Sequence, residues 1–354
     1  MSGRGKDFPV PAPETLNPIM LSYIVRRLFF VLFVVWGVTF ATFFIAQVVP
    51  VDPAIAALGE NAREEQLQEF RERYGLNKSK LEQYLIYMGR LLSGDLGQSL
   101  RTGRAVAEDL REFFPATLEL SLVAFALAVL LGIPAGILAS LFPNRAPDVA
   151  VRILALLGGA TPVFFSAVLL QYLLAQRLDL LPVQGRLDGF LFPPPRVTGM
   201  MSLDALLARD WTVFLDSLEH LILPAFVLGM FSAAILARMT RATMLEVLAQ
   251  DYIRTARAKG AVASSVIFRH ALKNASLPIL TLLGSLLGGL LSGAVLTETI
   301  FSWPGIGRYV TQSATSLDFP AVMGVTLLVG LVYALVNLVT DLLYAFLDPR
   351  IRYT

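Results

Sequence analysis

The sequence predicts an all-α polytopic membrane protein with about six transmembrane helices. Of its 354 residues, 55% are hydrophobic and only 16% are charged, whereas a soluble domain carries about 25% charged residues. The hydrophobic residues are also unevenly distributed, because long apolar runs alternate with segments of ordinary charge. A helix needs about 20 predominantly apolar residues to cross the hydrocarbon core of a bilayer, and most of the runs approach this length.

Six apolar stretches are expected to form the spans. The first follows Arg26 and Arg27 and exceeds the roughly 7–15 apolar residues of a secretory signal, so we interpret it as a retained helix. Pro134, Pro162 and Pro224 lie within or near span ends, where they can break or kink a helix. Small-residue pairs that let helix backbones approach closely occur at Gly132 and Gly136, Gly284 and Gly288, and Gly289 and Gly293. The stretches are residues 28–49, 118–141, 153–175, 221–238, 277–301 and 322–347.

The distribution of basic residues predicts the orientation of the chain. Two sets of segments between the expected spans can be compared. Lys and Arg are denser in residues 1–27, 142–152, 238–276 and 348–354 than in residues 50–117, 176–220 and 302–321. Because cytoplasmic segments carry the excess of Lys and Arg, both termini are expected to be cytoplasmic. Residues 1–19 are rich in proline and are expected to be a disordered extension.

The first outer segment, residues 50–117, is expected to contain three short amphipathic helices. Apolar residues recur at helical spacing in residues 67–74, 81–92 and 106–114. Two interpretations remain open for these helices. They either cover the helix bundle or form a docking rim for an extracellular partner.

No motif in the sequence predicts catalysis or a cofactor. Cysteine is absent, and neither a phosphate-binding Gly-x4-Gly-Lys loop nor a His-Glu-x-x-His zinc motif occurs. His220 and His270 fall on opposite sides of the expected membrane and therefore cannot share a metal. A net charge of +2 gives no basic field for nucleic acid. We expect no catalytic residue, no metal and no cofactor on this chain, and no nucleic acid partner.

Three ionisable residues fall within the apolar stretches: Glu119, Glu298 and Asp341. A charge in the bilayer centre is costly and therefore needs a reason. Glu119 and Glu298 lie near outer ends and are expected to reach water. Asp341 follows Asn337 by four residues on the same helix face, so both are candidates for facing the translocation pathway. A structural or partner-pairing role is the alternative for Asp341.

The segment 238–276 is the most informative part of the sequence. It contains a slim basic helix, then Gly260, then a second helix, with Pro278 opening the next span. Gly260 suits a left-handed turn residue. A short helix of small residues that projects from a membrane fits a groove on another protein. A basic loop that faces anionic membrane lipid is the alternative.

This segment resembles the coupling loop of ABC-importer permeases, in the form Tyr252-Ile-Arg-Thr-Ala-Arg-Ala-Lys-Gly260 that is typical of the dipeptide/oligopeptide/nickel family. Arg254 and Thr255 replace the Glu-Ala of the original motif, and Val51 replaces a glycine of a second motif. Further motifs similar to those of the family occur in order at residues 20–28, 50–53, 94–99, 220–225, 298–307 and 347–350. The resemblance covers residues 20–354.

The resemblance implies an ABC-importer permease fold and a role in ATP-driven uptake of short peptides across a prokaryotic plasma membrane. Its implied partners are a second homologous permease subunit, one or two cytoplasmic ATPases that hold ATP and magnesium, an extracytoplasmic solute-binding protein and membrane lipid. The residues implied to couple to an ATPase are Tyr252, Arg254, Thr255, Ala256, Arg257, Ala258, Lys259, Gly260 and Ala261.

Two other functions are alternatives to this one. A secondary transporter would use ionisable groups in mid-membrane and usually internal repeats, and the sequence shows neither clearly. A membrane enzyme would need a constellation of catalytic groups, which the sequence lacks. Transport by the chain alone or hydrolysis by the purified chain would favour these alternatives.

Overall fold

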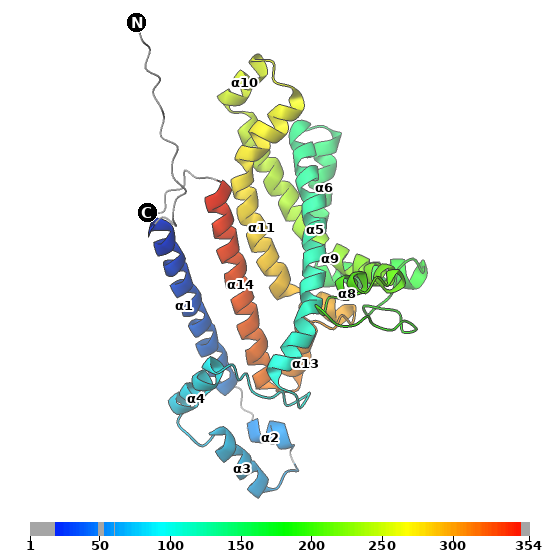
Figure 1. Cartoon of the computed structure of the whole chain (residues 1–354). Coiled ribbons are helices and arrows are strands. Elements are labelled where there is room, and N and C mark those ends of the chain that lie inside the picture. The colour runs from blue at the N-terminus through cyan, green and yellow to red at the C-terminus, as the bar shows by residue number, and fades with distance from the viewer. Residues whose placement is uncertain (1–17, 49–52, 60, 348–354) are drawn as a thin grey trace.

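The computed structural model describes residues 18–48, 53–59 and 61–347 of the chain, and Figure 1 shows their arrangement. These residues are helical apart from their connecting loops and one isolated bridge between Gln98 and Ala105. The helices are α1 (Pro18–Val48), α2 (Pro53–Leu58), α3 (Glu64–Tyr74), α4 (Lys80–Leu92), α5 (Val106–Leu141), α6 (Ala146–Ala160), α7 (Val163–Leu170), η1 (Gln171–Arg177), α8 (Met201–Leu207), α9 (Trp211–Leu248), α10 (Asp251–Ala258), η2 (Ser265–Leu272), α11 (Lys273–Gly293), α12 (Val295–Ile300), α13 (Ile306–Thr315) and α14 (Phe319–Leu347).

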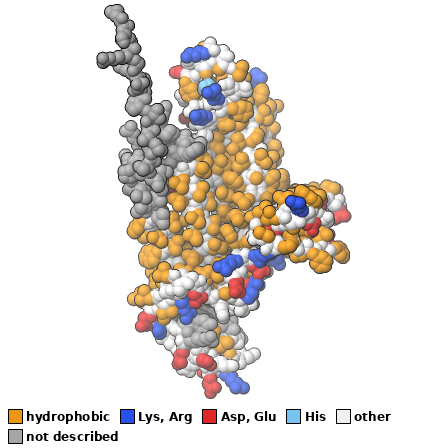
Figure 2. Space-filling model, viewed as in Figure 1, with side chains coloured by type: hydrophobic (Ala, Val, Ile, Leu, Met, Phe, Trp, Pro, Cys, Tyr) orange, Lys and Arg blue, Asp and Glu red, His pale blue; other side chains and the backbone are white. Residues whose placement is uncertain are grey.

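The long helices run side by side as a bundle with two distinct ends (Figure 1). At the end that we call the α10 end, α1 begins, α14 finishes and α10 projects beyond the other helices. At the opposite end, which we call the α4 end, lie α2, α3 and α4. Apolar side chains cover the visible face of the bundle between these ends, as expected for a surface in contact with lipid (Figure 2).

The predicted all-α membrane fold is confirmed. Four helical segments in the described part of the chain are long and apolar enough to span a membrane: 106–141, 211–248, 265–300 and 319–343. The bent pair of 146–160 and 163–177 brings the total to five if it crosses as one span. The first expected span lies in α1, which has a shorter apolar helix at Phe29–Ile45.

The third expected span, residues 153–175, is not one straight helix. It bends by 100° between α6 and α7, at Thr161 and Pro162. Thr161 is extended, with ψ 125°, because the ring of a following proline disfavours the helical conformation. Pro162 also lacks the N–H that a continuous helix would use. The expected break at this proline is therefore confirmed, whereas α5 and α9 continue through Pro134 and Pro224.

Several expected boundaries differ from the structure. Residues 106–114 are not a separate amphipathic helix but the first turns of α5, which continues through Pro115. Pro278 does not open the fifth span, because it lies inside α11 and the helical segment begins at Ser265. The expected disordered extension falls mostly outside the described residues, and α1 begins at Pro18.

The centre of the bundle is α9. In its most apolar window, 67% of the residues are buried, against 28% in α5 and 17% in α14. Glycines allow α5 and α9 to touch: a Cβ on Gly136 would lie 2.7 Å from the carbonyl oxygen of Ala237. Gly284 and Gly288 likewise lie against Thr340 and Tyr333 of α14. The α5–α9 pair is thus the most tightly packed support for the loop that follows α9.

Candidate functional site

The predicted coupling segment forms a short helix closed by a left-handed turn. The helix α10 ends at Ala258, and Gly260 has φ +80°, as the sequence predicted. The Gly260 N–H donates to the Arg257 carbonyl at 3.0 Å, and the Ala261 N–H donates to the Ala256 carbonyl at 3.1 Å. This pair of bonds is a Schellman motif, which satisfies two terminal carbonyls and requires a left-handed residue that is usually glycine.

One side chain fixes α10 to the bundle. Ile253 is fully buried and packs in a hydrophobic cluster with Met244 of α9 and Val266 of η2. Full burial of an isoleucine contributes about 1.5–3 kcal/mol. The helix is therefore held against the end of α9 by its apolar face and is free to present the opposite face.

The exposed face of α10 carries the predicted coupling residues. The Tyr252 side chain is 43% exposed, and Arg254 is exposed while it forms a 3.2 Å ion pair with Asp251 one turn earlier. The Thr255 hydroxyl donates to the Asp251 carbonyl at 3.0 Å. The remaining members are exposed or half-buried: Ala256, Arg257, Ala258, Lys259, Gly260 and Ala261. The structure brings all nine residues into one projection at the α10 end (Figure 1).

An ion pair joins the first turn of α6 to α9. The Asp148 carboxylate is fully buried and accepts from Arg241 Nε at 2.6 Å and from Arg241 Nη2 at 2.9 Å. It also accepts the Asn144 N–H at 2.8 Å. A bidentate guanidinium–carboxylate pair fixes orientation as well as distance, so a displacement of α9 would be transmitted to the α5–α6 turn.

The candidate pathway residues Asn337 and Asp341 lie far from α10 along the chain. Both line a cavity of about 320 Å³ between α1 and α14, together with Phe30 and Tyr333. They share one face of α14, as the four-residue spacing predicted. Their role in translocation stays a prediction.

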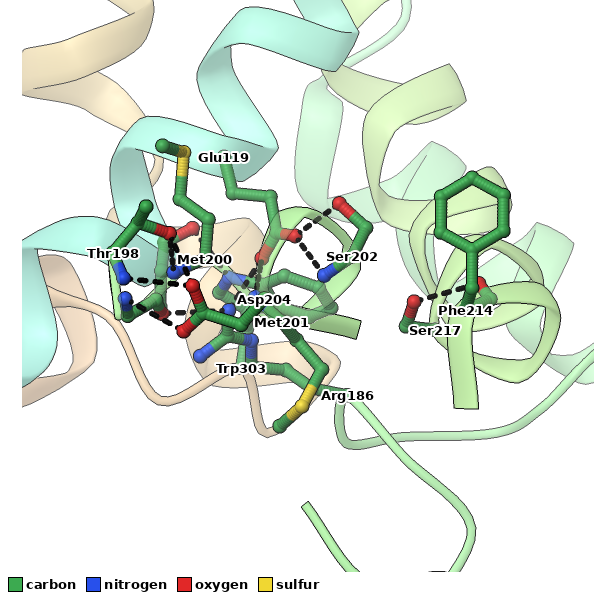
Figure 3. Close-up of polar contacts among 12 residues, drawn as sticks. Glu119, Arg186, Thr198, Met200, Met201, Ser202, Asp204, Phe214, Ser217 and Trp303 are labelled. Carbon is green, nitrogen blue, oxygen red and sulfur yellow. Dashed lines mark hydrogen bonds and ion pairs between the residues drawn. The ribbon is translucent and has the colours of Figure 1, made fainter. Parts of the chain in front are cut away.

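Glu119 does not reach water, contrary to expectation. It is 3% exposed and forms an ion pair with Arg186, as Figure 3 shows. Its carboxylate also accepts the Ser202 N–H at 2.7 Å, the Ser202 hydroxyl at 2.6 Å and the Met201 N–H at 3.2 Å. Arg186 lies over the Trp303 ring at 5.4 Å. This carboxylate therefore ties the loop before α9, including α8, to α5.

The same loop is closed locally by Asp204. Its carboxylate accepts the Thr198 N–H and hydroxyl, each at 2.7 Å, and the Gly199 N–H at 2.9 Å (Figure 3). Burial acts to raise the pKa of Asp204, but these hydrogen bonds outweigh it and hold the pKa below its ordinary value. The segment that Glu119 anchors is thus itself ordered.

Glu298 is also buried rather than exposed to water. It is 0% exposed, and it accepts the Thr117 hydroxyl at 2.6 Å and the Arg308 N–H at 2.9 Å. Thr117 in turn accepts the Ile306 N–H at 2.9 Å. Because Ile306 and Arg308 belong to the first turn of α13, Glu298 and Thr117 together supply hydrogen-bond acceptors that cap that helix.

Two further buried carboxylates bind the turn closed by the Gln98–Ala105 bridge, which we call the hairpin and which contains residues of the 94–99 motif. Ser99 donates to Asp318, which is 0% exposed. The Tyr309 hydroxyl donates to Asp109 at 2.8 Å, and Asp109 also pairs with Arg104. Sequence reasoning missed the Ser99–Asp318 and Tyr309–Asp109 hydrogen bonds because the partners are about 200 residues apart in the chain.

Comparison with known proteins identifies the family. The model for "Binding-protein-dependent transport system inner membrane component" matches residues 132–353, and the model for the corresponding N-terminal region matches residues 20–121. The chain is 48% identical over 330 residues to the "Probable D,D-dipeptide transport system permease protein DdpB" of Escherichia coli K12, covering 93% of this chain and 97% of that one. It is 43% identical over 334 residues to the "Dipeptide transport system permease protein DppB" of Alkalihalophilus pseudofirmus, covering 94% and 100%.

A solved structure was also matched. A chain of the inward-facing MetNI methionine ABC transporter shares 15% identity and a TM-score of 0.48, covering 68% of this chain and 96% of that chain.

The family predicted from the motifs is confirmed by the family models and the sequence relatives. The chain therefore belongs to the binding-protein-dependent transport system inner membrane components, the permease subunits of ABC importers.

Proposed function

We propose that this chain forms half of the translocation pathway of an ATP-driven importer of short peptides, and that α10 couples it to an ATPase. The relatives named as dipeptide transport permeases support the peptide class. The observation that carries the coupling role is the geometry of α10, whose apolar side is fixed by Ile253 while Tyr252 and Arg254 remain exposed. A short helix held rigidly at one end of a membrane bundle is suited to a groove on a partner.

The proposal includes a set of partners and an orientation. ATP and magnesium belong to one or two separate ATPase subunits, a second homologous permease completes the pathway, and a solute-binding protein delivers the peptide. The density of basic residues supports placing α10 and both termini on the cytoplasmic side of a prokaryotic plasma membrane.

The left-handed turn offers a direct test of coupling. In Gly260→Val, a β-branched residue would be forced to φ +80°, where no neighbour lies within 4 Å of an added Cβ, so the strain is purely in the backbone. Gly260→Asn is the tolerated replacement, because asparagine adopts this conformation more readily. Gly103→Val is the matched control: it has φ +68°, equally free space and a position in the hairpin away from α10.

The measurement is ATP-dependent uptake of a labelled dipeptide, together with ATP hydrolysis, by the assembled transporter in proteoliposomes. We expect Gly260→Val to lower uptake per ATP hydrolysed at least tenfold. Gly260→Asn and Gly103→Val should keep an uptake per ATP hydrolysed close to that of wild type. Normal uptake per ATP in Gly260→Val would contradict the coupling role. Absence of dipeptide uptake by the wild-type assembly would contradict the peptide class.

A further inference from the structure

Arg238 carries a guanidinium group that lies deep within the helix bundle. Its Nη2 is 3.5 Å from the position of a Cβ added to Gly159, which belongs to the last turn of α6. A Cβ on the neighbouring Gly158 would lie 3.4 Å from the Ala234 Cβ and 3.6 Å from the Met230 Cγ. The Arg238 side chain therefore extends back along α9 to the level of Ala234, away from the α10 end, in the direction that side chains on helices favour.

The level of Ala234 is near the middle of the membrane-spanning bundle. A Cβ on Gly132 of α5 would lie 2.9 Å from the carbonyl oxygen of Ala233, the residue before Ala234. Helix α5 ends at Leu141, about 13 Å beyond Gly132 at a rise of about 1.5 Å per residue. Since the hydrocarbon core is about 30 Å thick, a group at this level lies near its centre. An arginine near the end of a span usually extends to the membrane surface instead.

The described residues supply no counter-charge to this guanidinium. Arg238 is exposed on the surface of the chain and forms no hydrogen bond or ion pair with any of them. Arg241, one turn later, is by contrast paired with Asp148. The carboxylates of Glu119 and Glu298 accept from other donors. Because an uncompensated charge at this depth is costly and marks a functional site by default, the anion that pairs with Arg238 comes from outside this chain.

The break between α6 and α7 lies beside the guanidinium. Helix α6 ends at Ala160, the residue after Gly159, and the chain bends by 100° into α7. In membrane transporters, discontinuous helices near the midplane commonly form substrate sites. Backbone that leaves the helical conformation at this depth is tolerated where it is buried in protein or lines a water-filled cavity. This break is independent of the charge, and it favours the translocation pathway over lipid as the surroundings of Arg238.

The chemistry of arginine defines the class of anion. A guanidinium presents a planar fork of N–H donors that matches a carboxylate in a bidentate geometry. The phosphate groups of lipids lie at the membrane surface, about 15 Å from the centre of a core that is about 30 Å thick, and are therefore out of reach. An unmodified peptide ends in a carboxylate whatever its side chains are, so this one contact would hold peptides of different sequence.

We propose that Arg238 binds the C-terminal carboxylate of the transported peptide near the membrane midplane. The inference rests on the proposed function, because it requires a peptide in the pathway that this chain helps to form. An acidic side chain of the second permease subunit is the other source of a carboxylate at this depth, and the experiment below distinguishes the two sources.

The absence of native cysteine permits a single reporter next to the guanidinium. Ala160 is exposed at the end of α6, and Ala160→Cys is modified in the assembled transporter without its solute-binding protein. Anionic 2-sulfonatoethyl and cationic 2-aminoethyl methanethiosulfonate are compared by the mass of this chain. We expect the ratio of anionic to cationic rates to fall about tenfold when Arg238→Gln is added. Arg111→Gln, which removes an exposed arginine near the start of α5, is the matched control and should leave the ratio unchanged.

Protection by substrate then tests carboxylate binding. Ala-Ala should slow modification of Ala160→Cys by the anionic reagent, whereas Ala-Ala amide, which lacks the terminal carboxylate, should not. Arg238→Lys keeps the positive charge but loses the planar fork of donors. We therefore expect Arg238→Lys to retain the high ratio of anionic to cationic rates and to need at least a tenfold higher concentration of Ala-Ala for the same protection.

The outcomes that overturn the proposal are distinct. An unchanged rate ratio in Arg238→Gln, or no modification at position 160, would mean that the guanidinium does not face an aqueous pathway. Equal protection by Ala-Ala and its amide, or none, would exclude carboxylate binding. A high ratio in the isolated chain that disappears on assembly would assign Arg238 to an acidic side chain of the second subunit. Because this assay needs no ATP, each of these results together with normal dipeptide uptake would leave the proposed function intact.

Discussion

The contact between α5 and α9 permits a sharp prediction about Gly136. An added Cβ would lie 2.6 Å from the Thr240 Cβ and 2.7 Å from the Ala237 carbonyl oxygen, whereas non-bonded carbon atoms prefer about 3.5–4.0 Å. Thr240 is fully buried and the Ala237 carbonyl belongs to a helix, so neither can move cheaply. Overpacking of this kind costs about 1–3 kcal/mol. Alanine recovers up to about 1 kcal/mol through its higher helix propensity, which leaves a net loss of up to about 2 kcal/mol.

Gly289→Ala is the matched control for Gly136→Ala. Gly289 lies within α11, and no atom lies within 4 Å of its added Cβ, so this substitution keeps the propensity gain without the overlap. The assay is thermal unfolding of each purified variant in detergent, followed by circular dichroism. We expect a lower midpoint for Gly136→Ala and an unchanged or higher midpoint for Gly289→Ala. Equal midpoints for the two variants would refute the argument that α5 and α9 are in direct backbone contact.

Two further predictions concern buried polar groups at the α4 end and beside α8. Glu119→Leu should destabilise the protein by about 3–5 kcal/mol because it leaves Arg186 buried without its counter-charge. The Glu119→Leu/Arg186→Met double variant should recover part of this loss. A loss in the double variant equal to the sum of the losses in Glu119→Leu and Arg186→Met would exclude coupling of the pair. Burial raises the pKa of Tyr309, and the protonated hydroxyl donates a hydrogen bond to the Asp109 carboxylate. The folded-state pKa lies above the unfolded value of about 10, so this stabilisation is complete below pH 10 and is lost as pH rises further. The stability advantage of wild type over Tyr309→Phe, measured by thermal unfolding, should therefore be constant from pH 7 to 9 and shrink above pH 10, and a constant difference up to pH 11 would contradict it.

Local chemistry explains what the sequence could predict. The length of the apolar runs located the membrane-spanning segments. Gly260 marked a turn and Pro162 a break because their backbone preferences are intrinsic. The nine coupling residues came from a motif and form one projection. Their role in coupling stays a prediction.

Long-range contacts explain what the sequence could not predict. The expected fourth span ended at Arg238 because polar residues lower hydropathy, yet α9 continues to Leu248, where Arg241 pairs with Asp148 of another helix. Glu119 and Glu298 were expected in water, and both are buried because donors from distant segments surround them. Pairings over such sequence separations leave no local pattern from which the partner could be identified.

The central claim is that the exposed face of α10 contacts an ATPase subunit. A photo-crosslinking amino acid at position 254, where the native side chain is 75% exposed, is compared with the same amino acid at position 92 on α4, in native membranes with and without ATP. We predict a crosslink to an ATPase subunit from position 254 alone, with a yield that changes when ATP is added. No ATPase adduct at position 254, or an equal adduct at position 92, would contradict the account.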